Sequence, residues 1–191
     1  LNHGVVVNGS SVFAAAVLAV YAAAMAVRVD GKTMAIEMGG ETFTPETYRS
    51  GSAINFAHGT VVTLDGLNVP NPVFLFQAGS TLVTAADTHF ILVNGAKAEN
   101  VVWALGTAAT LGARSVVQGS ILAGTAITFG MESELHGCAL AQSAVTFGSE
   151  ASIVVGNVPV SLDEVTEEVK ASVSDSKQRF DLASLALEWS K

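Results

Sequence analysis

The sequence predicts a mostly β protein, a parallel β-helix built from coils of 18 residues. Two adjacent segments, 107–124 and 125–142, carry the same pattern, and a third copy begins at Ser143. Apolar and polar residues alternate around Thr128 as they do along a strand. Glycines recur at positions 112, 130 and 148, where a coil must turn. A short fixed period is typical of a solenoid, whose units bury their apolar faces against their neighbours.

The repeat also extends upstream. Copies begin at positions 42, 60, 78, 107, 125 and 143, which predicts about six coils. Only the interval from 78 to 107 departs from 18, by 11 residues, and Thr84 to Glu99 is the expected insertion. Three inward ladders follow from this frame: Leu64, Leu82, Leu111, Phe129 and Phe147; Phe56, Phe74, Trp103, Ile121 and Ala139; and Phe76, Leu105, Ala123 and Ala141.

The same frame places threonines in an outward column. Its members are Thr63, Thr81, Thr110, Thr128 and Thr146, and three residues before each of them stand Thr60, Ala78, Thr107, Thr125 and Ser143. Stacked strands lie about 4.8 Å apart, so the column predicts a charge-free rank of hydroxyls and methyls on a flat face. Threonine also suits strands, and a threonine ladder that only stabilises the sheet explains the pattern equally well.

Several segments resemble the microbial ice-binding protein family, also known as DUF3494. They are residues 76–84, 91–103, 119–130 and 139–147, together with Gly39 to Tyr48, which is similar to the family's segment of Gly-Gly, Thr-x-Thr-Pro and Tyr. The resemblance runs from about Ser10 to Asn157. It implies a right-handed β-helix of triangular section, a long α-helix along one side, and adsorption to ice through one flat face.

The resemblance also implies site residues. The paired Thr-Ala-x-Thr motif is similar to ice-site motifs in some members of the family. It maps onto Thr107, Thr110, Thr125 and Thr128, and in weaker form onto Ser143 and Thr146. With Thr63 and Thr81 from the outward column, these are the predicted ice-binding residues. The alternative face bears Gln118, Ser120 and His136.

Composition narrows the classes of partner. Half of the 191 residues are apolar and 14% are charged, so the chain is globular. A net charge of −8 argues against nucleic acid and against an anionic membrane surface, and suits a soluble secreted protein. The single cysteine, Cys138, excludes an internal disulfide and offers no metal cluster. We therefore expect an extracellular monomer without a metal or cofactor.

One domain, 1–159, is predicted to hold the solenoid and a flanking helix at about residues 10–28. Val12 to Val27 is rich in alanine and free of charge, which favours a helix. A membrane span needs about 20 apolar residues, more than this run has. A signal peptide needs a basic leader, and Leu1 to Ser11 has none. Ala24 to Ala26 does look like a cleavage site, so the signal peptide stays an alternative. A helix packed on the flank of the solenoid is the third interpretation, and it is the one that the family resemblance favours.

The rest of the chain follows in order. Thr33 to Met38 is expected to be a strand that enters the solenoid, and Asn68 to Pro72 an extended corner. The segment 160–191 is charged and contains neither glycine nor proline. Ser161 to Glu164 forms a capping box, which predicts a helical tail that caps the last coil or is mobile.

Other β-helix functions compete with ice binding. Apolar residues recur every six positions from Leu111 to Ile153, which resembles left-handed acyltransferases with a catalytic histidine. His136 is the only candidate, and we expect no carboxylate to orient it. Arg114, Glu132 and Glu150 share one repeat position, and ion pairing at a solvated corner explains them better than a polysaccharide-cleaving site. A flat threonine face also suits an adhesin or carbohydrate-binding protein. The sequence favours a non-enzymatic protein that binds ice.

Overall fold

The computed structural model describes residues 5–6, 19, 21–26 and 31–155. By its internal contacts the chain divides into two units, Leu1–Gly156 and Asn157–Lys191. The second unit lies outside the described residues, and so do the predicted boundary at residue 159 and the predicted helical tail. Those predictions stay open.

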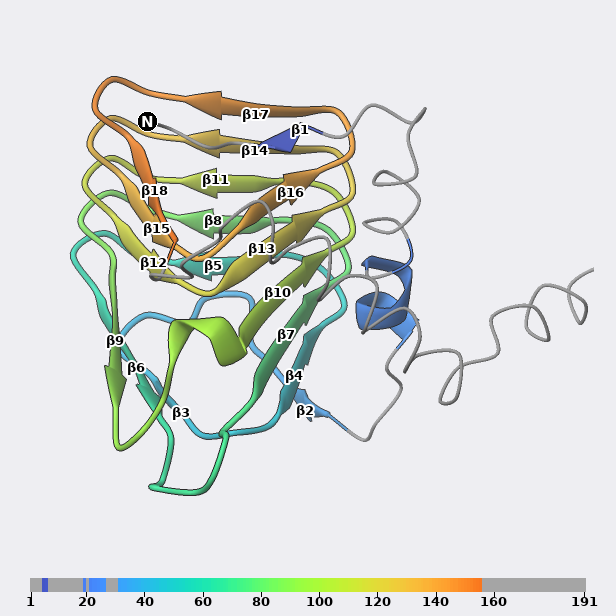
Figure 1. Cartoon of the computed structure of the whole chain (residues 1–191), viewed down its shortest axis with the longest axis vertical. Coiled ribbons are helices and arrows are strands. Elements are labelled where there is room, and N and C mark those ends of the chain that lie inside the picture. Colours follow the sequence, from blue (N-terminus) through green and yellow to red (C-terminus); the bar gives the residue numbers. More distant parts are fainter. Residues whose placement is uncertain (1–4, 7–18, 20, 27–30, 156–191) are drawn as a thin grey trace, which may run out of the picture. The chain divides into compact units, whose positions relative to one another are not determined.

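Three parallel sheets form the first unit (Figure 1). Sheet A holds β1 (Val5–Val6), β2 (Lys32–Thr33), β4 (Thr47–Ser50), β7 (Phe74–Ala78), β10 (Val101–Leu105), β13 (Ser120–Ala123) and β16 (Ala139–Ala141). Sheet B holds β5 (Ile54–Phe56), β8 (Leu82–Thr84), β11 (Ala109–Leu111), β14 (Ala126–Phe129) and β17 (Ala144–Phe147). Sheet C holds β3 (Thr42–Phe43), β6 (Val61–Asp65), β9 (His89–Val93), β12 (Val116–Gln118), β15 (Glu134–His136) and β18 (Ser152–Val154). From β4 onward the chain visits the sheets in the order A, B, C, so each coil adds one strand to each sheet. The predicted parallel β-helix is confirmed.

Coil length differs between the two halves of the solenoid. Thr110 pairs with Thr128, and Thr128 with Thr146, each 18 positions further on. Trp103 instead pairs with Phe76, 27 positions earlier, and Phe76 with Tyr48, 28 positions earlier. The additional residues lie between sheets C and A, at 66–73 and at 94–100, the second of which contains the 3-10 helix η1 (Ala98–Asn100). The predicted insertion from Thr84 to Glu99 therefore begins too early, because it includes β9, which is part of sheet C. The other excursion, the additional loop at 66–73, was not predicted.

The inward ladders are confirmed in the later coils and displaced in the earlier ones. Trp103, Ile121 and Ala139 stack as predicted, as do Leu105, Ala123 and Ala141, and Leu111, Phe129 and Phe147. Upstream, Phe76 rather than Phe74 stacks on Trp103, and Ala78 rather than Phe76 stacks on Leu105. Thr84 rather than Leu82 stacks on Leu111. Two residues lie in other sheets than predicted, Leu64 in sheet C and Phe56 in sheet B. A slip of two residues keeps every side chain on its own side of a strand, so the alternation alone could not detect it.

Aromatic rings fill the wide end of the core. The rings of Tyr48 and Phe76 stack with centroids 5.2 Å apart, and those of Phe76 and Trp103 with centroids 4.1 Å apart. The Trp103 indole N–H donates to the Gln118 carbonyl oxygen at 2.9 Å, so the buried polar atom is satisfied. In the later coils the rings of Phe129 and Phe147 stack at 4.7 Å beneath sheet B. The sheets are thus held from inside by ladders that run along the solenoid.

A left-handed residue marks each corner between sheets B and C. The five corner residues have φ angles between 55° and 69°: Gly59 (69°), Asp87 (58°), Arg114 (55°), Glu132 (56°) and Glu150 (59°). The residue that follows carries a hydroxyl at most of these corners. The buried Thr88, Ser115 and Ser133 donate to the carbonyl oxygen three residues earlier at 2.9, 2.6 and 2.8 Å. These bonds close each turn from inside and offset the cost of the left-handed conformation.

A short helix covers sheet A. Residues 19 and 21–26 are helical, and the rest of the predicted helix over 10–28 lies outside the described residues. The Tyr21 hydroxyl donates to the Leu105 carbonyl oxygen at 3.0 Å, and the Gln77 amide donates to the Ala24 carbonyl oxygen. The outward-facing Gln77, Ala104 and Leu122 of sheet A are buried. In the described part of the chain, no helix has the length and apolarity to cross a membrane.

Candidate functional site

The outward side of sheet B carries two rows of side chains. We call the first the corner row, because it lies where the chain turns from sheet A into sheet B. Its members are Ser52, Ser80, Thr107, Thr125 and Ser143, whose backbones are linked in succession by N–H to carbonyl bonds of 2.7–3.0 Å. The second, the strand row, consists of Asn55, Val83, Thr110, Thr128 and Thr146 in paired register. Half-buried alanines lie between the rows in the last three coils, at positions 108, 126 and 144.

The last three coils give this surface a regular composition. Thr107, Thr110, Thr125, Thr128, Ser143 and Thr146 are all exposed, and we call the surface they form the threonine face. Neighbouring strands repeat about every 4.8 Å, so each row presents a hydroxyl at that interval. Ile127 and Phe129 point inward beside Thr128 and are buried, which fixes the orientation of the strand between them.

Two of the predicted site residues lie elsewhere. Thr63 belongs to β6 of sheet C, where it pairs with Thr42 and Ile91. Thr81 precedes β8 and stands beside Ala108, because the Leu82 N–H donates to the Ala108 carbonyl oxygen. The prediction that both share the column of Thr110 is therefore wrong. The cause is coil length, since coils of 27 and 28 residues shift the frame that 18-residue spacing had assigned.

The other two sheets offer no comparable surface. In the described residues, the helix contacts sheet A through Tyr21 and Ala24, and the outward Gln77, Ala104 and Leu122 are buried. Sheet C mixes carboxylates, among them Asp65 and Glu134, and the imidazole of His89 with apolar side chains such as Ile91, which is 43% exposed. The alternative face predicted from Gln118, Ser120 and His136 does not exist as one surface, because Ser120 begins a strand of sheet A. In sheet B, by contrast, neither row carries a charged side chain.

His136 has a carboxylate partner that sequence analysis missed. Its Nε2 atom lies 2.6 Å from Oε1 of Glu134, two residues earlier on the same side of β15. Alternation along a strand could have predicted the pair, since positions two apart face the same way. Both side chains are about one-third exposed, and the described residues contain no group of three metal-binding side chains. The pair is explained as a polar contact between two side chains on the surface of sheet C.

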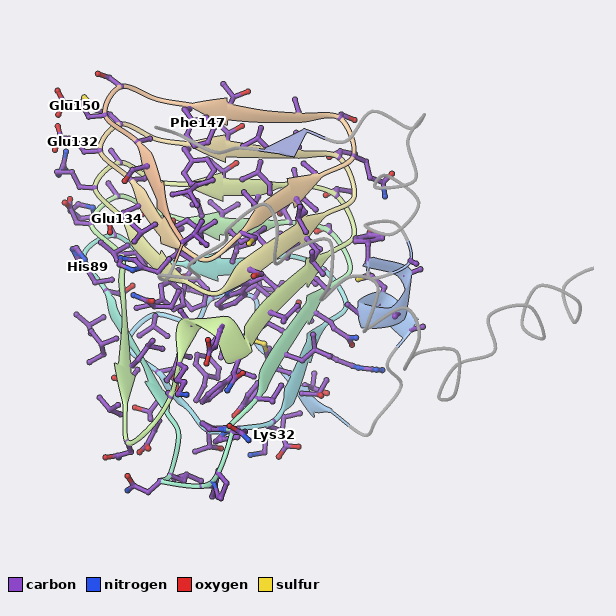
Figure 2. All side chains as sticks on the ribbon, in the orientation of Figure 1. Lys32, His89, Glu132, Glu134, Phe147 and Glu150 are labelled. Atoms are coloured by element: carbon purple, nitrogen blue, oxygen red, sulfur yellow. The ribbon has the colours of Figure 1, made fainter. Side chains whose placement is uncertain are left out.

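The predicted ladder of Arg114, Glu132 and Glu150 is confirmed as a column of corner residues, and Figure 2 shows Glu132 and Glu150 projecting from neighbouring corners. Asp87 extends the column upstream. Arg114 donates to it twice, Nε to Oδ1 at 2.7 Å and Nη2 to Oδ2 at 2.8 Å. These hydrogen bonds lower the pKa of Asp87 and raise that of Arg114. This corner is an ion-paired support beside sheet B.

A β-helix with one sheet covered by a helix and one charge-free threonine face defines a class of surface-binding solenoids. The sequence model of the family described as Ice-binding-like matches residues 6–153, and the chain belongs to this family. An ice-binding protein from Nostoc sp. (strain HG1) is 41% identical over 88 residues, which are 46% of this chain and 32% of that protein. The matching segment thus spans about a third of the length of this curated relative.

Solved structures agree with the fold. The crystal structure of an ice-binding protein from the Antarctic ascomycete Antarctomyces psychrotrophicus has a TM-score of 0.70 and 36% identity, covering 75% of this chain and 70% of that one. The structure of an ice-binding protein from an Antarctic Flavobacteriaceae bacterium has a TM-score of 0.71 and 29% identity, covering 81% of this chain and 37% of that one.

Proposed function

We propose that this protein binds ice through the threonine face and so restrains the growth and recrystallisation of ice crystals. The observation that carries the proposal is the register of Thr-Ala-x-Thr over successive coils. Thr110, Thr128 and Thr146 pair directly, and the corner row repeats beside them. The names of the relatives support the same function, since each is described as an ice-binding protein.

The chemistry of adsorption follows from the composition of the face. Hydroxyls donate and accept hydrogen bonds to water, while the threonine methyls and the alanines between the rows hold water only weakly. A charged group would hold a hydration shell that ice cannot incorporate, and the threonine face of the last three coils contains none. Because the strands are fixed by the core, docking orders few additional side chains and costs little conformational entropy. Protein anchored at many points then blocks growth of the ice surface between them.

This mechanism needs no bond-making step, metal or cofactor. We therefore propose a non-enzymatic role. The net charge of −8 suits a secreted protein, and we propose that it acts outside the cell as a monomer. The Glu134–His136 pair lies on sheet C, away from the proposed surface, and does not enter the mechanism.

The test is an assay of ice recrystallisation inhibition with Thr128→Tyr and a matched variant, Thr63→Tyr. Both replace an outward threonine within a strand, but Thr63 lies on sheet C. We expect Thr128→Tyr to raise the concentration needed for inhibition about tenfold or more, because its ring holds the face off the ice. Thr63→Tyr should keep the wild-type value. Equal activity of the two variants, with unchanged circular dichroism, would refute the assignment of the face.

A further inference from the structure

The strand row changes character halfway along sheet B. Thr110, Thr128 and Thr146 occupy its last three coils, but Val83 pairs with Thr110 and Asn55 pairs with Val83. Glu37 continues the row through an isolated bridge to Asn55, and its side chain is exposed. The row therefore runs from hydroxyls through a methyl-only side chain and an amide to a carboxylate.

The corner row does not change in the same way. Ser80 and Ser52 continue the hydroxyls of Thr107, Thr125 and Ser143, and Thr81 adds a further hydroxyl between the rows. Ser52 is exposed, and Ser80 and Thr81 are half-buried. Hydroxyls thus extend over five coils on one side of sheet B and over three on the other.

We propose that the ice-contacting surface extends along the corner row to Ser80 and Ser52, and that Val83 and Asn55 are the residues that stop it along the strand row. This inference rests on the proposed function and deepens it, because it sets the area of the same face. Ser80 and Ser52 become binding residues that the 18-residue frame did not assign. Val83 and Asn55 become the residues that determine how many coils contact ice.

The chemistry of each limiting residue supports this assignment. Val83 keeps the shape of threonine but replaces the hydroxyl with a methyl, so it cannot hydrogen-bond to an anchored water. The amide of Asn55 is longer and carries two donors and one acceptor in a plane, which does not continue the pattern of a threonine row. Beyond them, the carboxylate of Glu37 retains a hydration shell that is costly to remove.

The experiment compares wild type with Val83→Thr/Asn55→Thr in ice recrystallisation inhibition. The control is Ile91→Thr, which adds a hydroxyl at an outward position of sheet C. Two added hydroxyls should lower the inhibitory concentration about two- to fivefold. A change of this size corresponds to the net stabilisation of about one hydrogen bond or less. The control should leave it unchanged. Ser80→Tyr should weaken inhibition, because it would hold the earlier coils away from the ice.

The outcomes separate this inference from the proposed function. In one outcome, the wild type inhibits recrystallisation while the double variant inhibits no better and Ser80→Tyr inhibits no worse. That result overturns the extension of the surface and leaves the proposed function standing. Folded wild type without activity overturns both. A gain in Ile91→Thr equal to that of the double variant overturns the extension, because added hydroxyls would then act regardless of face. Circular dichroism of every variant establishes that the solenoid is intact.

Discussion

The Arg114 guanidinium binds the Asp87 carboxylate through two hydrogen bonds and so joins two successive corners of the solenoid. Both residues have left-handed backbones, with φ of 55° and 58°, so the ion pair connects two strained turns. His58 lies near the same carboxylate, its Nδ1 atom 3.6 Å from Oδ2. The pair stands at the B–C corner, opposite the corner row, and braces the other edge of sheet B.

The first prediction concerns acid stability. Arg114 lowers the pKa of Asp87 below its ordinary value of 3.8, so the folded state favours the carboxylate. This stabilisation is present above 3.8 and is lost as the pH falls through the lowered pKa of the folded protein. We expect Asp87→Asn to remove that part of the acid dependence, measured as the denaturation midpoint at a series of pH values. An acid profile identical to that of wild type would contradict the role of the pair.

A second prediction concerns alkaline pH. Burial raises the pKa of Tyr21 above 10.0, so the folded state favours its neutral hydroxyl. Stability from this group is complete below the unfolded value and is lost as the pH rises through the raised pKa. We expect Tyr21→Phe to be less sensitive to pH in this range. At neutral pH it should cost about 0.5–1 kcal/mol of unfolding free energy, since the Leu105 carbonyl oxygen keeps its bond from the Gly124 N–H at 3.0 Å.

A third prediction concerns the tight corner between sheets A and B. A Cβ atom added to Gly106 would lie 2.2 Å from the Gly79 carbonyl oxygen, whereas one added to Gly51 would meet nothing within 4 Å. Gly106→Ala should therefore lower the unfolding free energy by about 1–3 kcal/mol, because stacked backbones must move apart. Gly51→Ala, at the same corner of an earlier coil, is the matched control and should cost far less. Similar midpoints of chemical denaturation for both would show that the corner is not tightly packed.

A fourth prediction concerns metal ions. The threonine face contains only hydroxyls and methyls, and the described residues hold no cluster of three metal-binding side chains. Dialysis against a chelator should leave ice recrystallisation inhibition unchanged. A strong loss, restored by adding back a divalent cation, would mean that the active surface includes a ligand set outside the described residues.

The later coils could be predicted from sequence because their length is constant. Between the coils that begin at Thr107, Thr125 and Ser143, every pairing follows the 18-residue frame, and the side-chain column at Arg114 is correct. Upstream, the excursions at 66–73 and 94–100 alter the length of each coil, and nothing in an alternating pattern fixes where a coil closes. Thr63 was therefore assigned to the wrong sheet, and Asp87 was not recognised as the partner of Arg114.

The site was harder to predict than the fold for the same reason. Membership of a face depends on the cumulative length of all preceding coils, so one misplaced excursion moves a threonine to another surface. The error does not affect the column of Thr110, Thr128 and Thr146, because no additional loop lies between these residues. The Glu134–His136 pair was missed for a different reason, since a search for repeated positions does not compare residues within one strand.

Both excursions leave the solenoid between sheets C and A, away from the corners that border sheet B. The chain therefore accommodates changes in length at the C–A edge while the strands of sheet B keep their register. One more 18-residue unit copied from residues 125–142 would insert between β16 and β17 in the register that the last coils now have, and its sheet A strand would take the place that β1 holds beside β16. The solenoid can in this sense be lengthened by whole coils, because an added coil of 18 residues leaves the register of the coils before it unchanged.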